Sequence, residues 1–567
     1  MTHPGHLFRN PLLAAAGAVL SALVAVPTLA QPAPAPPATP QPEAAAEPAA
    51  IAAAEAPETL AEDQSLTVWS RDPIRTLDPQ KSGDPVSDQA IRLLFEGLYR
   101  PGPDGRPLPA MAERHEVSAD GLTWRFHLRP GVTWADGAAL TAGDFVTAFR
   151  RLADPAFGSP GGWFTQLMGL RNADAVVRGD APPSELGVRA VDDDTLELAL
   201  RTPTPWIDKA VMRVWTFPVP TARLEAAATD GAEWTASDRL IGNGPFALRN
   251  FDAEKGAGFT RNARWRDADS VRLTEIEIRT GGAAAAALDR FDAGEIDLLA
   301  VPGPLFGDWS KGREDAAAAL PRACTNGLIV NVGEDALPLL KKPAVRRALS
   351  LAIDRQAIVA ALGGGQRPAW GWVPPGMDGF VEPPVPDAAR TQDDRMAEAA
   401  RLMAGAGVGT ETSMRLTLHY NSSPAHETVA AALRAAWKPL GVDLRLIHAD
   451  WTEHADLVRT GEFQLARWGW CADVNDASVF LRQFRSDGIN PGGFSDPAYD
   501  RLTAEAATAA DPDPQNTRAA GILRDQVPII PIFHYATPLL IAPDLRGVAW
   551  DDPMGGWSGQ DIWRAAE

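Results

Sequence analysis

The segment from Arg467 to Asp473 carries side chains that could bind a ligand with a charge at each end. Its sequence is Arg-Trp-Gly-Trp-Cys-Ala-Asp, so a guanidinium and a carboxylate lie near two tryptophan rings. Opposite charges beside apolar walls are what a site needs in order to hold both ends of a zwitterion. The alternative is a buried strand over residues 463–466 that runs into a loop, in which Asp and Asn side chains only cap turns.

The sequence around this segment predicts alternating strands and helices. After Cys324, apolar periodicity and start and stop signals indicate four strands and three helices. The predicted strands are residues 328–332, 416–418, 442–447 and 463–466, and the predicted helices are residues 344–362, 427–437 and 453–458. Such alternation favours a mostly parallel or mixed sheet covered by helices, with ligands at strand ends near a crevice between lobes. The segment after residue 466 is expected to be a loop at such a strand end.

The chain before Cys324 is predicted to be mixed α/β structure with much antiparallel strand. Residues 122–128 alternate apolar and polar side chains, which indicates a half-buried strand. Thr141 and Asp144 have the spacing of a capping box that opens a helix over residues 145–152. The fold class predicted for the whole chain is therefore α/β.

Length and charge limit the architecture and the partners. At 567 residues the chain is too long for one ordinary core, so two or three lobes are expected. The formal net charge is -20 at pH 7. This balance gives no support for binding a phosphate backbone, so nucleic acid is not expected as a partner.

The N-terminal residues resemble an export signal followed by a tether. His3, His6 and Arg9 precede an apolar run over residues 12–26, and small residues end at Ala30. This pattern predicts a signal peptide over residues 1–30 and a periplasmic location. The alternative is a retained membrane anchor, although the apolar run is short for a full span. Residues 31–61 are almost entirely Ala, Pro and Glu, which predicts a disordered linker.

The chain has two cysteines, Cys324 and Cys471. In an exported protein a disulfide can persist. Closing a loop of 471 − 324 = 147 residues would restrict the unfolded chain by about 4–5 kcal/mol in the chain-entropy account. The alternative is two separate buried thiols, because spacing alone does not show that their Cα atoms come close.

Sequence motifs for catalysis are not found. The chain has no GxxxxGK[ST] phosphate loop, no GxSxG elbow and no CxxC pair. His426 and Glu427 begin like the HExxH zinc signature, but Ala430 stands where the second His must be. The prediction is a protein that is not an enzyme and that needs no metal and no cofactor.

Several short segments, taken in order, match one family. They are Leu-Phe-Glu-Gly-Leu at residues 94–98, Trp-Arg-Phe-His-Leu-Arg at 124–129, Trp-Ala-Asp-Gly at 134–137, Thr-Ala-Gly-Asp-Phe at 141–145, Asn-Gly-Pro-Phe at 243–246 and Arg-Arg-Ala-Leu-Ser-Leu-Ala-Ile-Asp-Arg at 346–355. Together with Arg467-x-Gly-Trp-Cys-Ala-Asp473, they make the chain resemble the periplasmic oligopeptide-binding proteins of ABC importers, the OppA type. The resemblance runs from about residue 66 nearly to the C-terminus.

The resemblance implies the fold of a periplasmic binding protein of class II, cluster C, with two large lobes around a ligand cleft and an extra third domain. The implied divisions are residues 65–101, 218–321 and 535–567 for lobe I, residues 102–217 for the extra domain II, and residues 322–534 for lobe III. The chain would cross between lobes I and III near Arg322 and His534. These two crossings would form the hinge that lets the cleft close.

The same resemblance implies roles for individual residues. Asp473 would receive the α-ammonium of a peptide, and a disulfide would join Cys324 to Cys471. Main-chain groups from Gly469 through Trp470 to Cys471 would pair with the peptide backbone as an added strand does. Binding would then depend on backbone and termini.

Other positions match the family at the far end of the cleft. Arg467 and His426 would receive the C-terminal carboxylate, although each could instead be a local salt bridge or a helix-start residue. The positions that match cleft-lining residues are Trp451, Trp470 and Tyr535. The chain departs from the family at Val458, where a second Arg is expected and Arg459 is one place off, and at Phe164, which replaces a Tyr.

The resulting hypothesis is a non-catalytic, monomeric receptor that binds short peptides and delivers them to ABC transporter permease subunits at the inner membrane. A second hypothesis keeps the receptor and changes the cargo to a murein peptide, an opine-like amino-acid conjugate or a metal chelate. The displaced Arg beside Val458 leaves that choice open. A third hypothesis is a periplasmic hydrolase, which turnover of a peptide library would reveal.

Overall fold

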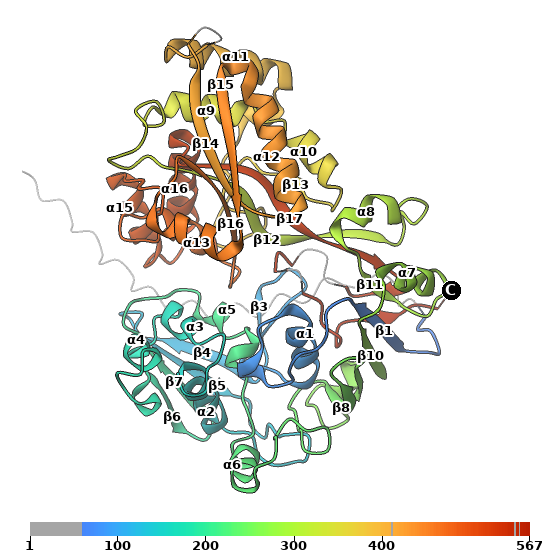
Figure 1. Cartoon of the computed structure of the whole chain (residues 1–567). Coiled ribbons are helices and arrows are strands. Elements are labelled where there is room, and N and C mark those ends of the chain that lie inside the picture. The colour runs from blue at the N-terminus through green and yellow to red at the C-terminus, as the bar shows by residue number, and fades with distance from the viewer. Residues whose placement is uncertain (1–58, 410–411, 549–551, 555, 567) are drawn as a thin grey trace, which may run out of the picture. The chain divides into compact units, whose positions relative to one another are not determined.

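A computed structural model describes residues 59–409, 412–548, 552–554 and 556–566 (Figure 1). The predicted signal peptide, residues 1–30, and residues 31–58 of the predicted linker lie outside the described residues. All described residues belong to one compact unit, residues 58–567. Within this part of the chain, no helix combines the length and the apolar character needed to cross a membrane.

One mixed sheet of eleven strands runs through this unit. Its order is β15-β14-β16-β12-β17-β11-β1-β10-β9-β8, and β13 pairs with β17 beside this path. The strands are β1 (Ser65–Ser70), β8 (Phe246–Asp252), β9 (Gly256–Arg261), β10 (Glu275–Thr280), β11 (Leu298–Ala300), β12 (Ala317–Val330), β13 (Arg367–Pro368), β14 (Met414–Asn421), β15 (Val442–Ala449), β16 (Leu465–Cys471) and β17 (Ile529–Ile541).

Strands β12 and β17 hold this sheet together. They have 14 and 13 residues and pair antiparallel from Ala317 opposite Leu540 to Ile329 opposite Ile529. One end of the pair continues through β11 to the strands near the N-terminus, and the other continues through β16 to β14 and β15 (Figure 1). Segments far apart in the sequence therefore share one hydrogen-bonded framework.

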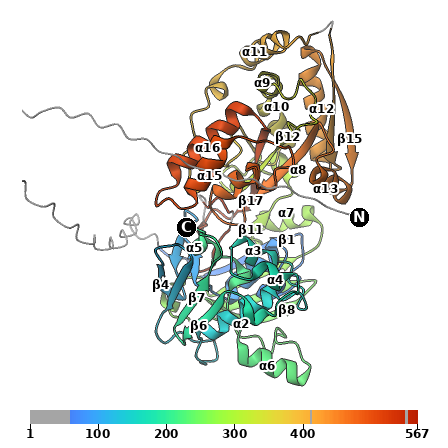
Figure 2. The ribbon, with the colours of Figure 1, turned by 90° about the vertical axis from the view of Figure 1, so that its left-hand side faces the viewer.

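Helices cover β14, β15 and β16 as the alternation predicted. In Figure 1, α12 lies on one side of β14 and β16, and α15 and α16 lie on the other. Figure 2 shows α15 and α16 next to each other and away from α12 and β15. The helices of this region are α9 (Pro343–Leu351), α10 (Arg355–Leu362), α11 (Gln392–Gly405), α12 (Pro424–Trp437), α13 (Trp451–Thr460), α14 (Ser478–Leu481), α15 (Pro497–Ala506) and α16 (Asp513–Gln526).

Helix α12 shows why this packing forms. Its buried residues are Val429, Ala430, Leu433 and Trp437, which repeat at helical spacing and make one apolar face. Trp437 is fully buried, and its indole N–H donates to the carbonyl of Leu349 in α9 at 2.8 Å. The polar atom of this large side chain therefore keeps a partner inside the core.

The predicted helix over residues 344–362 is wrong as a single element. The structure has α9 and α10 separated at Ala352–Asp354. Asp354 accepts a hydrogen bond from the backbone N–H of Ala357, so it caps the start of α10 and ends the first helix. Apolar periodicity continues across the break, which explains why the pattern suggested one helix.

A second, antiparallel sheet has the order β4-β5-β7-β6. Its strands are β4 (Ala112–Val117), β5 (Thr123–Leu128), β6 (Val188–Asp192) and β7 (Thr195–Ala199). Helix α2 (Ala142–Ala153) packs on it, and Asp144 accepts from the backbone N–H of Thr141 at 3.1 Å, as in the predicted capping box. The predicted strand over residues 122–128 is confirmed by β5.

The remaining elements are short strand pairs and helices. The strand pairs are β2 (Tyr99–Pro101) with β3 (Pro107–Pro109) and β18 (Leu545–Arg546) with β19 (Trp563–Arg564). The helices are α1 (Pro85–Leu94), α3 (Trp163–Leu167), α4 (Ala173–Val177), α5 (Ile207–Ala210), α6 (Thr221–Asp230), α7 (Ala284–Asp292) and α8 (Gly303–Trp309). Lys209 in α5 forms an ion pair with Asp476 in the loop after β16. It is the one residue that does so among the described residues of these short elements.

Candidate functional site

Strand β16 is longer than the sequence predicted and contains most of the candidate site. The predicted strand over residues 463–466, followed by a loop, is wrong at both ends, because β16 spans Leu465–Cys471. Residues Arg467 to Cys471 pair with Leu328 to Cys324 of β12 in antiparallel register. This distant partner extends the strand, and a local pattern does not contain that information.

The strand has a side that faces away from β12. Ala472 N donates to Ala323 O at 2.7 Å, whereas Arg467 O accepts from His454 Nε2 at 3.0 Å. In an antiparallel pair, residues alternate between hydrogen-bonded and non-hydrogen-bonded positions. The backbone N–H and C=O groups of Arg467, Gly469 and Cys471 are therefore directed away from β12.

Much of this outward edge is open in the described part of the chain. On that side β14 pairs with β16 only at Leu465 and Ala466. Gly469 and Cys471 thus present backbone donors and acceptors without a neighbouring strand among the described residues. Such an edge is able to accept an extended chain as one more strand.

The predicted disulfide is present. Cys324 lies directly opposite Cys471, their Cα atoms are 4.0 Å apart, and their sulfur atoms are bonded. This is a non-hydrogen-bonded pair, the position at which opposite side chains approach most closely. The bond ties the end of β16, and hence the Asp473 loop, to β12.

Asp473 is a partly buried carboxylate at the end of this edge. It has no ion pair within 4 Å among the residues that the structure describes. Burial raises the pKa of the Asp473 carboxyl above its ordinary value, and the positive charges of Arg213 and Arg482 oppose that rise. The carboxylate is thus desolvated and lacks a direct cationic partner, so it suits an incoming ammonium.

Arg467 lies at the other end and contacts Tyr535. Its Nη2 donates to the Tyr535 hydroxyl at 2.9 Å, while its buried Nε has no hydrogen-bond partner among the described residues. Asn326 Nδ2 donates to the same hydroxyl at 3.2 Å. The guanidinium is therefore held in place and keeps donors for an anion.

His426 lines the same small cavity as Arg467. Its Nδ1 lies 2.8 Å from Asn421 O, to which it donates, so Nε2 is left as an acceptor in the neutral ring. Burial and the nearby charge of Arg467 lower the pKa of His426 to about 4. Near pH 7 this histidine is neutral and offers no second positive charge to a carboxylate.

The aromatic candidates occupy different environments. Trp470 stacks on Trp468 with ring centroids 6.1 Å apart and is partly buried, beside the open edge. Trp451 is 62% exposed at the start of α13, and its ring centroid is 6.4 Å from that of His454. The structure thus groups Trp470 and Tyr535 with the charged residues, while Trp451 lies on the surface of the helix that carries His454.

Arg459, one position after Val458, does not take the place of the arginine expected at position 458. Val458 is 3% exposed and belongs to the apolar core, whereas Arg459 is exposed and pairs with Asp456 at 3.2 Å. One step along α13 rotates a side chain by about 100°. Arg459 therefore points to solvent, and a second arginine is missing from the inward-facing position.

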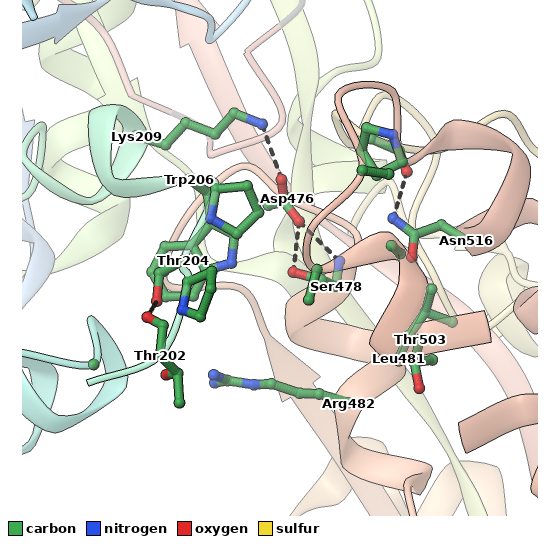
Figure 3. Close-up of a pocket in the computed structure, with 18 of the residues that line it drawn as sticks. Thr202, Thr204, Trp206, Lys209, Asp476, Ser478, Leu481, Arg482, Thr503 and Asn516 are labelled. Carbon is green, nitrogen blue, oxygen red and sulfur yellow. Dashed lines mark hydrogen bonds and ion pairs between the residues drawn. The ribbon is translucent and has the colours of Figure 1, made fainter. Parts of the chain in front are cut away.

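An ion network that includes Asp476, in the loop after Asp473, was not predicted from the sequence. Lys209 Nζ lies 3.0 Å from Asp476 and 3.3 Å from Asp378, and all three side chains are largely buried. Figure 3 shows Lys209 reaching towards Asp476, with Arg482 on the other side of the same pocket. Lys209 and Asp476 are 267 positions apart, so no local motif contains both.

The described residues contain no group of three or more His, Cys, Asp or Glu side chains that could hold a metal ion. What they do contain is an open strand edge with a buried carboxylate beyond one end and a positioned guanidinium at the other. This arrangement has binding groups for a backbone and for two opposite charges. It fits a solute-binding protein that captures a ligand without changing it.

Comparison with known proteins identifies the family. The family of bacterial extracellular solute-binding proteins, family 5 Middle, matches residues 106–492, and the chain belongs to this family. Its members are non-catalytic receptors, so the hydrolase hypothesis is set aside.

Three relatives of Escherichia coli strain K12 match most of the chain. They are the periplasmic murein peptide-binding protein MppA (35% identical over 510 residues; 88% of this chain and 94% of the relative), a probable deoxycholate-binding periplasmic protein, YgiS (33% over 484 residues; 84% and 89%), and the periplasmic oligopeptide-binding protein OppA (32% over 513 residues; 88% and 93%). The unliganded open form of MppA, a murein tripeptide binding protein, has a TM-score of 0.83 at 34% identity and covers 89% of this chain and 98% of its own. The predicted fold class is confirmed by this likeness.

Proposed function

We propose that this chain is the periplasmic receptor of an ABC importer, and that it binds short peptides and delivers them to the membrane permease. The observation that carries the proposal is the open backbone edge of β16 between Arg467 and Asp473. Two similar proteins are named for binding oligopeptides and murein peptide, which agrees with a ligand recognised by backbone and termini.

The charges at the two ends of the edge set the direction of the peptide. Its ammonium pairs with Asp473, beyond the C-terminal end of β16, and its carboxylate points towards Arg467. The peptide then runs antiparallel to β16. Four residue steps separate Arg467 from Cys471, a distance of about 13 Å in a strand, which suits an extended peptide of roughly three or four residues. The side chains of the peptide contribute less, so the receptor tolerates many sequences.

The lobes proposed from the family give this site a means of closing. In this proposal, lobe I comprises residues 65–101, 218–321 and 535–567, domain II residues 102–217, and lobe III residues 322–534. Strands β12 and β17 pass through both proposed crossings, and their pairing shifts register between Pro321 and Thr325. A register irregularity is a place where two paired strands bend most easily, which supports a hinge there.

Export and assembly complete the proposal. Residues 1–30 act as the signal peptide, and the mature protein works as a monomer in the periplasm. The linker is shortened from the predicted residues 31–61 to residues 31–58, because residues 59–61 form antiparallel backbone hydrogen bonds with residues 564–566. The relatives with printed periplasmic names support this location. Membership of a family of extracellular solute-binding proteins supports the proposed delivery to permease subunits.

A murein tripeptide is the second candidate cargo, because the similarity to MppA extends over 88% of the chain. The loss of the second arginine at Val458 also removes a charge that would otherwise favour one position of the ligand carboxylate. Competition between murein tripeptide and tri-alanine, measured by calorimetry, separates the two cargoes. Displacement of tri-alanine at equimolar murein tripeptide would favour the second candidate.

The proposed function is tested first with the protein as purified. Native mass spectrometry is expected to show bound species with the masses of short peptides, and calorimetry is expected to show binding of tri-alanine. N-acetylated tri-alanine should bind at least roughly 100-fold more weakly, because it lacks the ammonium that neutralises Asp473. A bound bile-acid-like mass together with no peptide binding would contradict a peptide receptor.

Arg467→Met is expected to weaken tri-alanine binding by about 10- to 100-fold, because a charge-assisted hydrogen bond to the carboxylate is lost. C-amidated tri-alanine provides the control, because Arg467→Met should no longer weaken its binding.

His426→Gln should change the affinity little at pH 7, since burial and Arg467 lower the His426 pKa to about 4 and the ring carries no charge there. Wild-type affinity should likewise stay nearly constant between about pH 7 and pH 6, a range in which the α-ammonium of the peptide is already mostly protonated. An affinity that rises steeply from pH 7 to pH 6 would contradict the neutral His426.

A further inference from the structure

A cavity of about 760 Å³ is lined in part by Asp476 and Ser478, which belong to the segment that follows Asp473. One wall comes from residues 201–209 before and within α5, and the other comes from residues 476–487, which include α14, and from α15 and α16. Figure 3 shows Arg482 extended from the second wall across the pocket, in the direction of Thr202 on the first. The cavity is therefore lined by segments that the proposed function assigns to different domains.

Among the described residues that line this cavity, Arg482 differs from every other cation. The other positive side chains each have a carboxylate within 4 Å: Arg106, Arg201, Lys209 and Arg485. Arg482 has no such ion pair in the described part of the chain and lies partly buried in the wall. A partly desolvated guanidinium without a carboxylate keeps a planar set of donors for an anion.

Arg482 belongs to the same segment of chain as Asp473, because it directly follows α14, which lies between the two residues. Burial lowers the pKa of the Arg482 guanidinium, and the negative charges of Asp473 and Asp476 oppose that fall. Asp476 is already satisfied by Lys209 and by the hydroxyl of Ser478. Asp473 and Arg482 therefore carry opposite charges that act on each other, although no ion pair within 4 Å joins them among the described residues.

We propose that Arg482 binds the side-chain carboxylate of an acidic N-terminal residue of the ligand. This inference rests on the proposed function, because it requires the peptide ammonium at Asp473. A peptide that begins with Glu or Asp carries its ammonium and a carboxylate on the same residue, so it satisfies both charges at once. A guanidinium binds a carboxylate through two parallel hydrogen bonds, and the wall of the cavity leaves room for that group.

Calorimetry with Glu-Ala-Ala, Gln-Ala-Ala and Ala-Ala-Ala tests this assignment. In the wild-type protein we expect Glu-Ala-Ala to bind about tenfold more tightly than its uncharged isostere Gln-Ala-Ala. In Arg482→Gln that ratio should fall to about one while Ala-Ala-Ala still binds. Arg485→Gln is the matched control, because it removes a cation of the same cavity that already pairs with Asp487, and it should keep the wild-type ratio.

Three other outcomes are informative. Equal binding of the two isosteres by the wild-type protein overturns the assignment without requiring any variant to fold. An equal gain in affinity for all three peptides in Arg482→Gln also overturns it, because Arg482 would then only balance the charge of Asp473. Failure of the wild-type protein to bind any of the three would overturn the proposed function itself. The failures of the two proposals are thus distinguishable.

Discussion

Asp473→Ala is expected to abolish most of the affinity for tri-alanine, with a loss of about 3–5 kcal/mol, which corresponds to a Kd roughly 150- to 4000-fold higher. The loss is large because closure would bury the ligand ammonium without a counter-charge. Among the described residues, the wild-type carboxylate has no direct ion pair to give up when the ligand binds. Isothermal calorimetry on the ligand-free mature protein measures the change.

Two matched variants separate charge from shape. Asp473→Asn keeps the size of the side chain and should lose nearly as much affinity as Asp473→Ala. Asp456→Ala removes an exposed carboxylate of α13 that pairs with Arg459, and it should bind tri-alanine as the wild-type protein does. Unchanged affinity in Asp473→Asn would remove this carboxylate from ammonium recognition.

The affinity should also depend on pH in one direction. Burial raises the pKa of the Asp473 carboxyl above its ordinary value of 3.8 in the free protein. Ammonium binding requires the ionised form, so affinity is fully present above that raised pKa and is lost as the pH falls through it. Asp473→Asn should not show this acid-side loss.

Local elements near the site could be predicted because their patterns are local. Helices α12 and α13 and strands β14 and β15 were each found at the predicted place, with ends shifted by a few residues. Their apolar residues repeat with the period of the element, and caps such as Asp450 mark where a helix begins. The burial of Val458 shows which face of α13 packs against the core.

The parts that could not be predicted depend on distant partners. Strand β16 reaches Cys471 because β12, more than a hundred positions earlier, pairs with it. That Arg482 differs from the other cations of the cavity is seen only when their ion pairs with carboxylates are known. The disulfide was predicted through a family resemblance, since the spacing of two cysteines does not fix the distance between their Cα atoms.

The double variant Cys324→Ser/Cys471→Ser is expected to lower the free energy of unfolding by about 4–5 kcal/mol in the chain-entropy account, because a 147-residue loop is released in the unfolded chain. The folded protein should change less, since the β12 and β16 ladder continues from Thr325 opposite Trp470 to Val330 opposite Leu465 without the bond. Urea unfolding of the ligand-free mature protein measures the loss.

The same variant tests whether the bond serves stability or binding. If the disulfide acts mainly on the unfolded chain, the double variant should bind tri-alanine with nearly the wild-type affinity once folded, and its urea m-value should rise because the unfolded state is more expanded. If the bond instead positions the Asp473 loop, the affinity falls while the free energy of unfolding changes little. The ladder on both sides of Asn326 and Gly469 favours the first result, because backbone hydrogen bonds already fix the end of β16.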